Sequence, residues 1–201
     1  MLHEGKFVFI LFLMLFRNII LLSLILGGMM PVVHAQDFMW KAENGKAQIK
    51  SDAPLEVIKA ESNALKGLID PATKAFAFTL RINTFEGFNS EIQQVHFFEN
   101  YLEQKKYPQA TFSGKIIEDI PFSTPGTYSV RAKGNLEIHG VSRERIIRGT
   151  LTIKKGSAHV ESSFLVPVSD HGIAIPRIVK QKIAEEIAVI MDIDFAEVIK
   201  L

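Results

Sequence analysis

Apolar and polar residues alternate with a period of two through most of the chain after residue 46, as in β-strands that bury one face. Four runs are regular. Their apolar faces comprise Phe76, Phe78, Leu80 and Ile82; Tyr128, Val130, Ala132, Gly134, Leu136 and Ile138; Val160, Ser162, Phe164, Val166 and Val168; and Ile187, Val189, Met191, Ile193 and Phe195. Less regular runs predict further strands at residues 47–51, 55–60, 64–70, 111–118 and 146–154. Turn residues such as Pro125-Gly126 separate the runs.

Two segments are predicted to be short helices. Ser90 and Gln93 form a capping-box pattern in which the Gln93 side chain reaches back to the first turn. The apolar residues that follow lie three or four apart: Ile92, Val95, Phe98 and Leu102. Pro108 marks the end of this segment. A second helix is predicted from Pro176, a residue favoured in the first turn, to about Glu186.

Eight or nine antiparallel strands with two short helices predict a mainly β fold closed into a barrel. Closure is favoured because an open sheet of so many strands would leave long unpaired edges. Residues 36–201 contain no linker, charge block or internal repeat, and we expect them to form a single barrel domain.

The interior of a barrel of about eight strands holds packed side chains or one slender ligand. Small residues on the inward faces, namely Ala132, Gly134, Ser162 and Gly114, leave volume that an elongated apolar ligand would fill. A solid core of interdigitated large and small residues is the alternative, and periodicity does not separate the two. The residues expected to line a lumen are Phe76, Phe78, Leu80, Ile82, Phe112, Val130, Leu136, Phe164, Val166, Met191 and Phe195.

The N-terminus has the pattern of a secretory signal peptide. A nearly continuous apolar stretch runs from Phe7 to Gly28, and Val33-His34-Ala35 precedes Gln36. We predict cleavage after Ala35, which makes residues 1–35 the signal peptide and leaves no stable membrane span. An uncleaved anchor over residues 7–30 is the alternative. Met14 is an alternative start that would make Arg17 the charged residue before the apolar core.

Composition narrows the function classes. The chain has 23 Lys and Arg against 22 Asp and Glu, a balance that argues against nucleic-acid binding. It has no cysteine, which excludes disulfides, cysteine nucleophiles, Cys-ligated metals and a cysteine-linked lipid anchor. An exported chain without disulfides depends on its core for stability.

Four blocks resemble the YceI-like family in order and spacing: residues 85–90 (FEGFNS), 96–102 (HFFENYL), 107–112 (YPQATF) and 132–141 (AKGNLEIHGV). The resemblance covers roughly Ala47 to Phe195. It implies a lipocalin-like antiparallel barrel of exported bacterial proteins, whose members enclose polyisoprenoid chains or other amphiphiles in an apolar tunnel.

This sequence departs from the family pattern at two places. The His-Ser or His-Thr pair that often opens the family's first strand is absent, and residues 55–62 stand there instead. The Arg-Asp pair before the helix histidine is replaced by Gln93-Gln94. The identity of the ligand therefore stays open.

Histidines offer few catalytic candidates. His96 and Glu99 lie three residues apart on the first predicted helix and could share a face as metal ligands, but no second close pair such as His-x-His accompanies them. His96 with Asn100, four residues apart, could equally be a hydrogen-bonded pair that fixes the helix against the barrel, and this structural role is favoured. His139 and His171 each precede a glycine at a turn, and we expect each ring to bond to the local backbone of its own turn. His159 is expected to be a solvated strand residue.

Serine hydrolase chemistry has weak support. Ser162-Ser163 and the run Ser169-Asp170-His171 occur without a Gly-x-Ser-x-Gly elbow, and a turn explains the latter run better. The chain has neither a phosphate-binding loop nor a dinucleotide fingerprint. We therefore predict no catalytic residues, no cofactor and no metal.

The sequence favours an exported, non-catalytic protein, periplasmic or secreted, that encloses an isoprenoid or other long-chain amphiphile. A structural or interaction protein of the envelope, with a solid barrel and an exposed loop at 85–89, is the alternative. An enzyme that uses His96 and Glu99 is a further alternative. The sequence does not decide whether the protein forms a homodimer. The basic clusters at 105–106, 143–148 and 154–155 are predicted to be solvated faces, with a head-group contact as the second interpretation.

Overall fold

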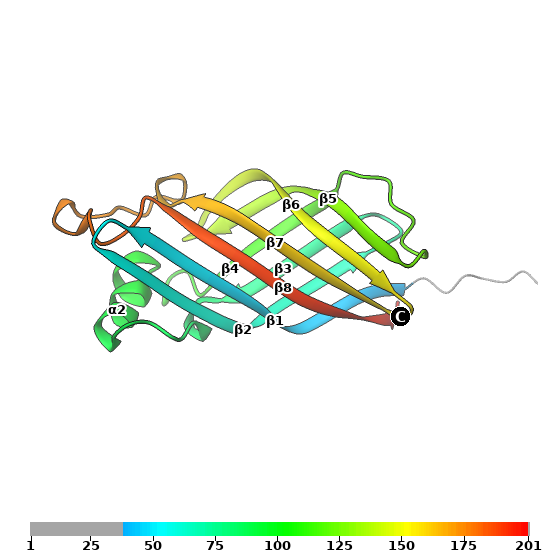
Figure 1. Cartoon of the computed structure of the whole chain (residues 1–201), viewed down its shortest axis with the longest axis horizontal. Coiled ribbons are helices and arrows are strands. Elements are labelled where there is room, and N and C mark those ends of the chain that lie inside the picture. Colours follow the sequence, from blue (N-terminus) through cyan, green and yellow to red (C-terminus); the bar gives the residue numbers. More distant parts are fainter. Residues whose placement is uncertain (1–37, 201) are drawn as a thin grey trace, which may run out of the picture. The chain divides into compact units, whose positions relative to one another are not determined.

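The computed structural model describes residues 38–200, whose eight antiparallel strands close into a barrel (Figure 1). Each strand pairs with its neighbours in sequence, and the last strand pairs with the first. The strands are β1 (Phe38–Ala53), β2 (Glu56–Asp70), β3 (Ala75–Arg81), β4 (Gln109–Ile116), β5 (Gly126–Ile138), β6 (Val141–Lys154), β7 (Ser157–Pro167) and β8 (Glu186–Ile199). The predicted closed barrel of about eight strands is confirmed. The signal segment 1–35, with its cleavage after Ala35, lies outside the described residues.

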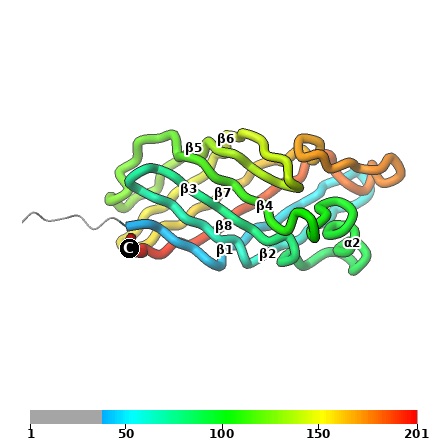
Figure 2. Tube along the Cα trace, turned by 180° about the vertical axis from the view of Figure 1, so that it is seen from behind, coloured from blue at the N-terminus to red at the C-terminus, as the bar shows by residue number. Residues whose placement is uncertain are grey.

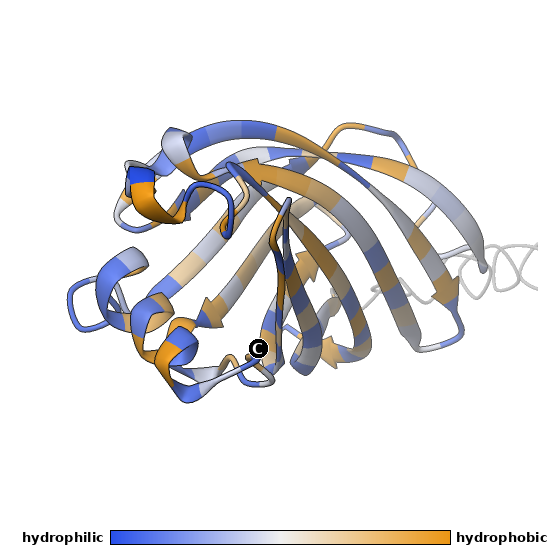
Figure 3. Cartoon of the chain, turned by 60° about the vertical axis from the view of Figure 1, so that its left-hand side comes forward, coloured by the Kyte–Doolittle hydropathy of each residue, from blue (hydrophilic) through white to orange (hydrophobic). Residues whose placement is uncertain are grey.

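The alternation of apolar and polar residues decides which side chains of each strand point into the barrel. Figure 3 shows this alternation along the ribbons. In β3 every second residue from Phe76 is buried, as predicted. Two strands are longer than expected. The runs at 55–60 and 64–70 belong to one strand, β2, and the run at 47–51 is the second half of β1. The pairing of β1 with β2 shifts register on either side of Gly45, which interrupts the alternation there.

The first predicted helix exists but is shorter and irregular. Helix α2 spans Glu91–His96, and a wider π-helical turn, η2 (Phe97–Tyr101), follows it. The Gln93 backbone N–H donates to Ser90 Oγ over 3.4 Å, while the Gln93 side chain accepts from the Asn89 N–H rather than that of Ser90. The predicted apolar stripe is only partly buried, because Ile92 and Val95 remain 58% and 44% exposed.

The second predicted helix, from Pro176 to Glu186, is wrong. The segment contains only a short 3-10 turn, η4 (Arg177–Val179), after another, η3 (Val168–His171). Its backbone bonds outside itself: Gln181 O accepts from the Leu55 N–H over 2.8 Å, and the Ala184 N–H donates to Ser51 Oγ over 2.8 Å. These two bonds tie the segment to β1 and to the β1–β2 turn. The bonds inside the segment close single turns only, such as that from the Ile183 N–H to the Val179 carbonyl oxygen over 3.1 Å. A short helix needs a packed apolar face, and Ile178 is 91% exposed.

The two ends of the barrel differ. One end of the barrel is that at which β8 finishes, opposite α2 (Figure 1). Aromatic and aliphatic side chains fill this end, and the Trp40 ring centroid lies 5.6 Å from that of Phe122. The other end carries α2 and the β7–β8 connection, which Figure 2 shows at the same end as the β1–β2 turn. We call the first the closed end and the second the mouth. No helix within residues 38–200 is long and apolar enough to cross a membrane.

Candidate functional site

The half of the barrel nearest the mouth contains an apolar cavity of about 150 Å³. Eight of the eleven residues predicted for the lumen line it: Phe78, Leu80, Ile82, Phe112, Leu136, Phe164, Val166 and Met191. The other three, Phe76, Val130 and Phe195, face inward but are buried in the packed core toward the closed end. Phe76, for example, lies 4.8 Å from Phe112, ring centroid to ring centroid. The cavity therefore ends halfway along the barrel.

A second, larger pocket of about 450 Å³ lies at the mouth. It shares six lining residues with the inner cavity: Ile49, Phe97, Leu102, Val168, Ile173 and Ile187. The two spaces are therefore adjacent, with a common wall of apolar side chains. The mouth pocket has the size of small-molecule sites in proteins, roughly 300–1,000 Å³.

The polar groups of the site gather at the mouth. The mouth pocket is lined by Glu56, Gln93, His96, Tyr101 and Lys182, among others. The Gln93 amide donates to the Glu56 carboxylate, which joins α2 to the start of β2. Burial raises the pKa of the Tyr101 hydroxyl, so this group stays protonated at neutral pH. The site thus runs from an apolar interior to a mouth pocket in which polar groups stand among apolar side chains such as Ile58, Phe88 and Ile92.

Packed aromatic rings hold α2 and η2 on the barrel. Phe97 lies 5.5 Å from Phe85 and 5.0 Å from Phe88, and Phe98 lies 6.1 Å from Phe88, each measured between ring centroids. Phe85 is only 5% exposed and Phe88 is half-buried. The loop at 85–89 is therefore not the exposed apolar patch that the interaction-protein alternative required.

Two histidines tie the mouth connections together. His139 Nδ1 lies 3.2 Å from the His171 carbonyl oxygen, and His139 Nε2 lies 3.2 Å from Glu103 Oε1. The fully buried His171 ring places Nδ1 3.0 Å from the Val141 carbonyl oxygen. The prediction that each ring bonds to the local backbone of its own turn is wrong, because the His139 and His171 rings bond to carbonyl oxygens 32 and 30 residues away and so join neighbouring connections.

The small inward residues do not leave the space expected of them. Cβ atoms built on Gly114 and Gly134 would collide with the backbone of the neighbouring strand, so these glycines allow β4 and β5 to approach closely. Ser162 Oγ donates to the Arg148 carbonyl over 2.6 Å. At Gly67, a Cβ would lie 2.7 Å from the Phe195 ring, so that aromatic side chain already fills the space. The small residues that do line the cavity are Ala47 and Ala110.

The catalytic candidates are not brought together. His96 is exposed at the mouth pocket, and Glu99 is exposed on the following turn. Ser169, Asp170 and His171 lie in η3, where Arg143 Nε donates to the Asp170 carbonyl over 2.7 Å. The one group of described residues whose atoms are placed to hold a metal ion is elsewhere, at His159.

The basic clusters have local partners. Lys106 lies 4.8 Å above the Tyr107 ring, and Arg145 donates to the Leu165 carbonyl over 2.9 Å. Lys154 and Lys155 flank the β6–β7 turn at the closed end, away from the mouth pocket. Sequence reasoning missed Tyr101 and Lys182, which line the mouth pocket from two segments that were predicted to be regular helices and instead have irregular backbone.

A closed antiparallel barrel with an apolar internal cavity and a polar mouth defines a class of small β-barrels suited to hold a ligand inside. A family model for the YceI-like domain matches residues 39–195, and the chain belongs to this family. The resemblance noted in the sequence is thereby confirmed.

Solved structures share the fold. A polyisoprenoid binding domain from Saccharophagus degradans, implicated in plant cell wall breakdown, has a TM-score of 0.66 at 11% identity, covering 80% of this chain and 98% of that one. BcnA of Burkholderia cenocepacia has a TM-score of 0.61 at 15% identity, with 75% and 95% covered. The YceI protein of Campylobacter jejuni has a TM-score of 0.54 at 18% identity, with 71% and 84% covered. No curated protein matches the chain at a significant level.

Proposed function

We propose that this protein is an exported, non-catalytic binding protein of the periplasm or the secreted fraction, and that it encloses the apolar chain of a polyisoprenoid-like amphiphile. The observation that carries the proposal is the inner cavity, lined by aliphatic and aromatic residues and adjoining the larger mouth pocket. The family match and the likeness to a polyisoprenoid binding domain support the same ligand class.

In this proposal the hydrocarbon chain lies against Phe78, Leu136 and Met191, and the polar head stays at the mouth near Lys182 and Tyr101. Binding is driven by burial, since each methylene transferred from water contributes about 0.8 kcal/mol. A Lys182 ammonium and the Tyr101 hydroxyl at the opening suit an alcohol or phosphate head group. The narrow inner cavity selects slender chains over fused rings.

The test is native mass spectrometry of protein purified gently from the exported fraction, followed by solvent extraction and lipid analysis. We expect a stoichiometric added mass that extracts as an isoprenoid or another long-chain lipid. The stripped protein is then offered geranylgeraniol and cholesterol at equal concentration, and only geranylgeraniol should be taken up. A protein that carries no added mass and takes up neither lipid would overturn the proposal.

A further inference from the structure

Four side chains on the outer wall of the barrel form a square across β7 and β8. His159 and Glu161 are alternate residues of β7, and they lie directly opposite Asp194 and Asp192 of β8. Their neighbour Ile193 points inward and is 1% exposed, so the square lies on the opposite, outer face. This group is separate from the lumen, and its chemistry is independent of the proposed function.

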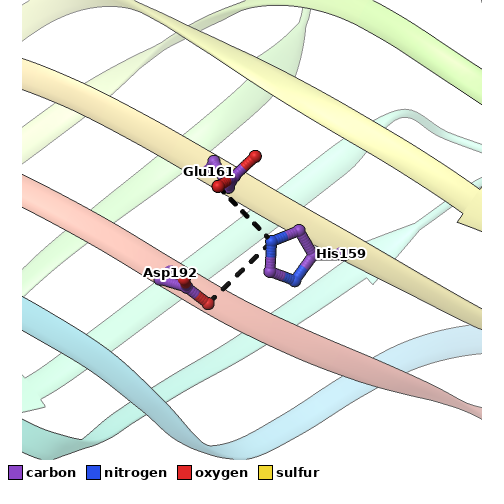
Figure 4. Close-up of side chains that lie close together, drawn as sticks. All are labelled: His159, Glu161 and Asp192. Atoms are coloured by element: carbon purple, nitrogen blue, oxygen red, sulfur yellow. Dashed lines mark ion pairs between the residues drawn. The ribbon is translucent and has the colours of Figure 1, made fainter.

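Three donor atoms of the square converge (Figure 4). His159 Nε2 lies 3.9 Å from Glu161 Oε1 and 3.9 Å from Asp192 Oδ1, and the three residues each offer one ligand atom within 4.8 Å of the others. Ligands about 2.1 Å from a tetrahedral Zn²⁺ lie about 3.4 Å from one another. To reach coordination distance, the two distances from His159 Nε2 must shorten by about half an ångström. The two carboxylate oxygens, which lie within 4.8 Å of each other, must approach by up to about 1.4 Å, and rotation about the single bonds of these side chains allows both movements.

The fourth residue orients the imidazole. His159 Nδ1 lies 2.8 Å from Asp194 Oδ1, a hydrogen bond in which the ring N–H donates to the carboxylate. In the neutral ring this leaves Nε2 as the bare donor nitrogen, and it is Nε2 that faces Glu161 and Asp192. A carboxylate bonded to the distal nitrogen of a ligand histidine is the usual supporting contact at protein zinc sites.

The square carries three carboxylates around one histidine, and a bound cation would neutralise this negative charge. Glu161 stands directly opposite Asp192, and like charges at such a position destabilise a strand pair. Within residues 38–200, no lysine or arginine lies within ion-pair distance of either carboxylate. Lys46, the β1 partner of Asp192, bonds Glu61 over 2.8 Å instead. Elsewhere on the wall Glu43 has two lysine partners, so this square differs from its surroundings.

We propose that His159, Glu161 and Asp192 bind a divalent transition-metal ion of the Zn²⁺ type, with Asp194 as the positioning residue and water in the remaining coordination position. One imidazole nitrogen with two carboxylate oxygens favours Zn²⁺, Co²⁺ or Ni²⁺ over Mg²⁺ and Ca²⁺, which prefer oxygen ligands alone. The bound ion would neutralise the opposed carboxylates and fasten β7 to β8 at their midpoint.

The test uses the untagged full chain, treated with EDTA and exchanged into a buffer that does not bind metals. Calorimetric titration with ZnCl₂ should give one ion per chain with a dissociation constant on the order of micromolar, and added Zn²⁺ should raise Tm. Co²⁺ should give the visible absorption of a low-symmetry site. His159→Gln and Asp192→Asn should each weaken binding by tenfold or more, and Asp194→Asn by about 10–100-fold.

Glu144→Gln, which removes an exposed carboxylate on β6 that pairs with Lys133, is the matched control and should bind Zn²⁺ like the parent chain. Mg²⁺ at the same concentration should not raise Tm. The proposal is overturned if the parent chain binds no Zn²⁺ in the titration. It is equally overturned if His159→Gln and Asp192→Asn bind the ion as tightly as the parent, because the ion then sits elsewhere.

Discussion

A substitution that adds an aromatic ring inside the lumen would test ligand binding separately from the stability of the fold. Ala110 of β4 pairs with Leu80 of β3, and both residues line the inner cavity together with Ile138. The substitution Ala110→Phe therefore projects a benzyl ring into the space that the proposed ligand chain would occupy. Ser113 lies three residues further along β4 and is exposed, so Ser113→Phe adds the same ring to the outer wall.

The expected changes in ligand affinity and in folding stability can be estimated from the groups displaced and from the volume of the cavity. A benzyl ring displaces roughly five methylene-sized groups of a bound chain, which at about 0.8 kcal/mol each is about 4 kcal/mol, or up to about a thousandfold in affinity. Filling a cavity of about 150 Å³ at about 24 cal/mol per Å³ would stabilise the unliganded barrel by at most about 3.6 kcal/mol. Strain from overpacking opposes this gain by about 1–3 kcal/mol.

We therefore expect Ala110→Phe to keep or raise the Tm of the stripped protein while weakening binding at least tenfold. Binding is measured by displacing a fluorescent polyene fatty acid with geranylgeraniol, and unfolding is followed by the fluorescence of Trp40, the single tryptophan. Ser113→Phe should bind like the parent. Undiminished binding by a stably folded Ala110→Phe chain would refute the assignment of the lumen as the binding site.

Two further predictions concern stability. The Arg131 side chain bonds Glu118 over 2.7 Å and holds the pKa of that carboxyl below its usual 4.5, so this contribution to folding is present above pH 4.5 and is lost as pH falls through the lowered value. Glu118→Gln should thus lower Tm at pH 7, and this loss of Tm should become smaller as pH falls below 4.5 in matched thermal scans; an equal loss at pH 7 and pH 3 would contradict this. Phe122→Ala removes a buried ring from the closed end and should cost about 3–5 kcal/mol, a fall in Tm of about 6–20 °C, without changing geranylgeraniol binding. An unchanged Tm would show that Phe122 does not plug that end.

The side chains that point into the barrel could be predicted, because the period-two alternation can be recognised in each strand without knowing which strand pairs with it. Phe78, Leu80 and Leu136 face inward for that reason. The depth of the cavity could not be predicted, because it depends on which residues meet across the barrel. Phe195 fills the space beside Gly67, and this contact between β8 and β2 is visible only once the register is known.

The need to know the strand register also explains why the square of side chains on the outer wall could not be predicted from the sequence. His159 and Glu161 alternate in the sequence, but nothing in that run shows that Asp192 and Asp194 stand opposite them more than thirty residues later. The helix predicted from Pro176 failed for a related reason. Periodicity describes a segment by itself, whereas this segment bonds to Ser51 and the β1–β2 turn.

The two halves of the barrel are stabilised in different ways, which bears on how a ligand would enter. The closed end is packed with rings such as Trp40 and Phe122, whose separation would expose much apolar surface. At the mouth, packed rings hold α2 and η2, but the β7–β8 connection is held by hydrogen bonds, such as that from the Leu55 N–H to Gln181 O and that between His139 and His171. Local opening takes the least free energy where few apolar contacts are lost. The β7–β8 connection can therefore open while α2, the strand ladder and the closed end stay intact, and this connection lines both the mouth pocket and the apolar cavity through Ile173.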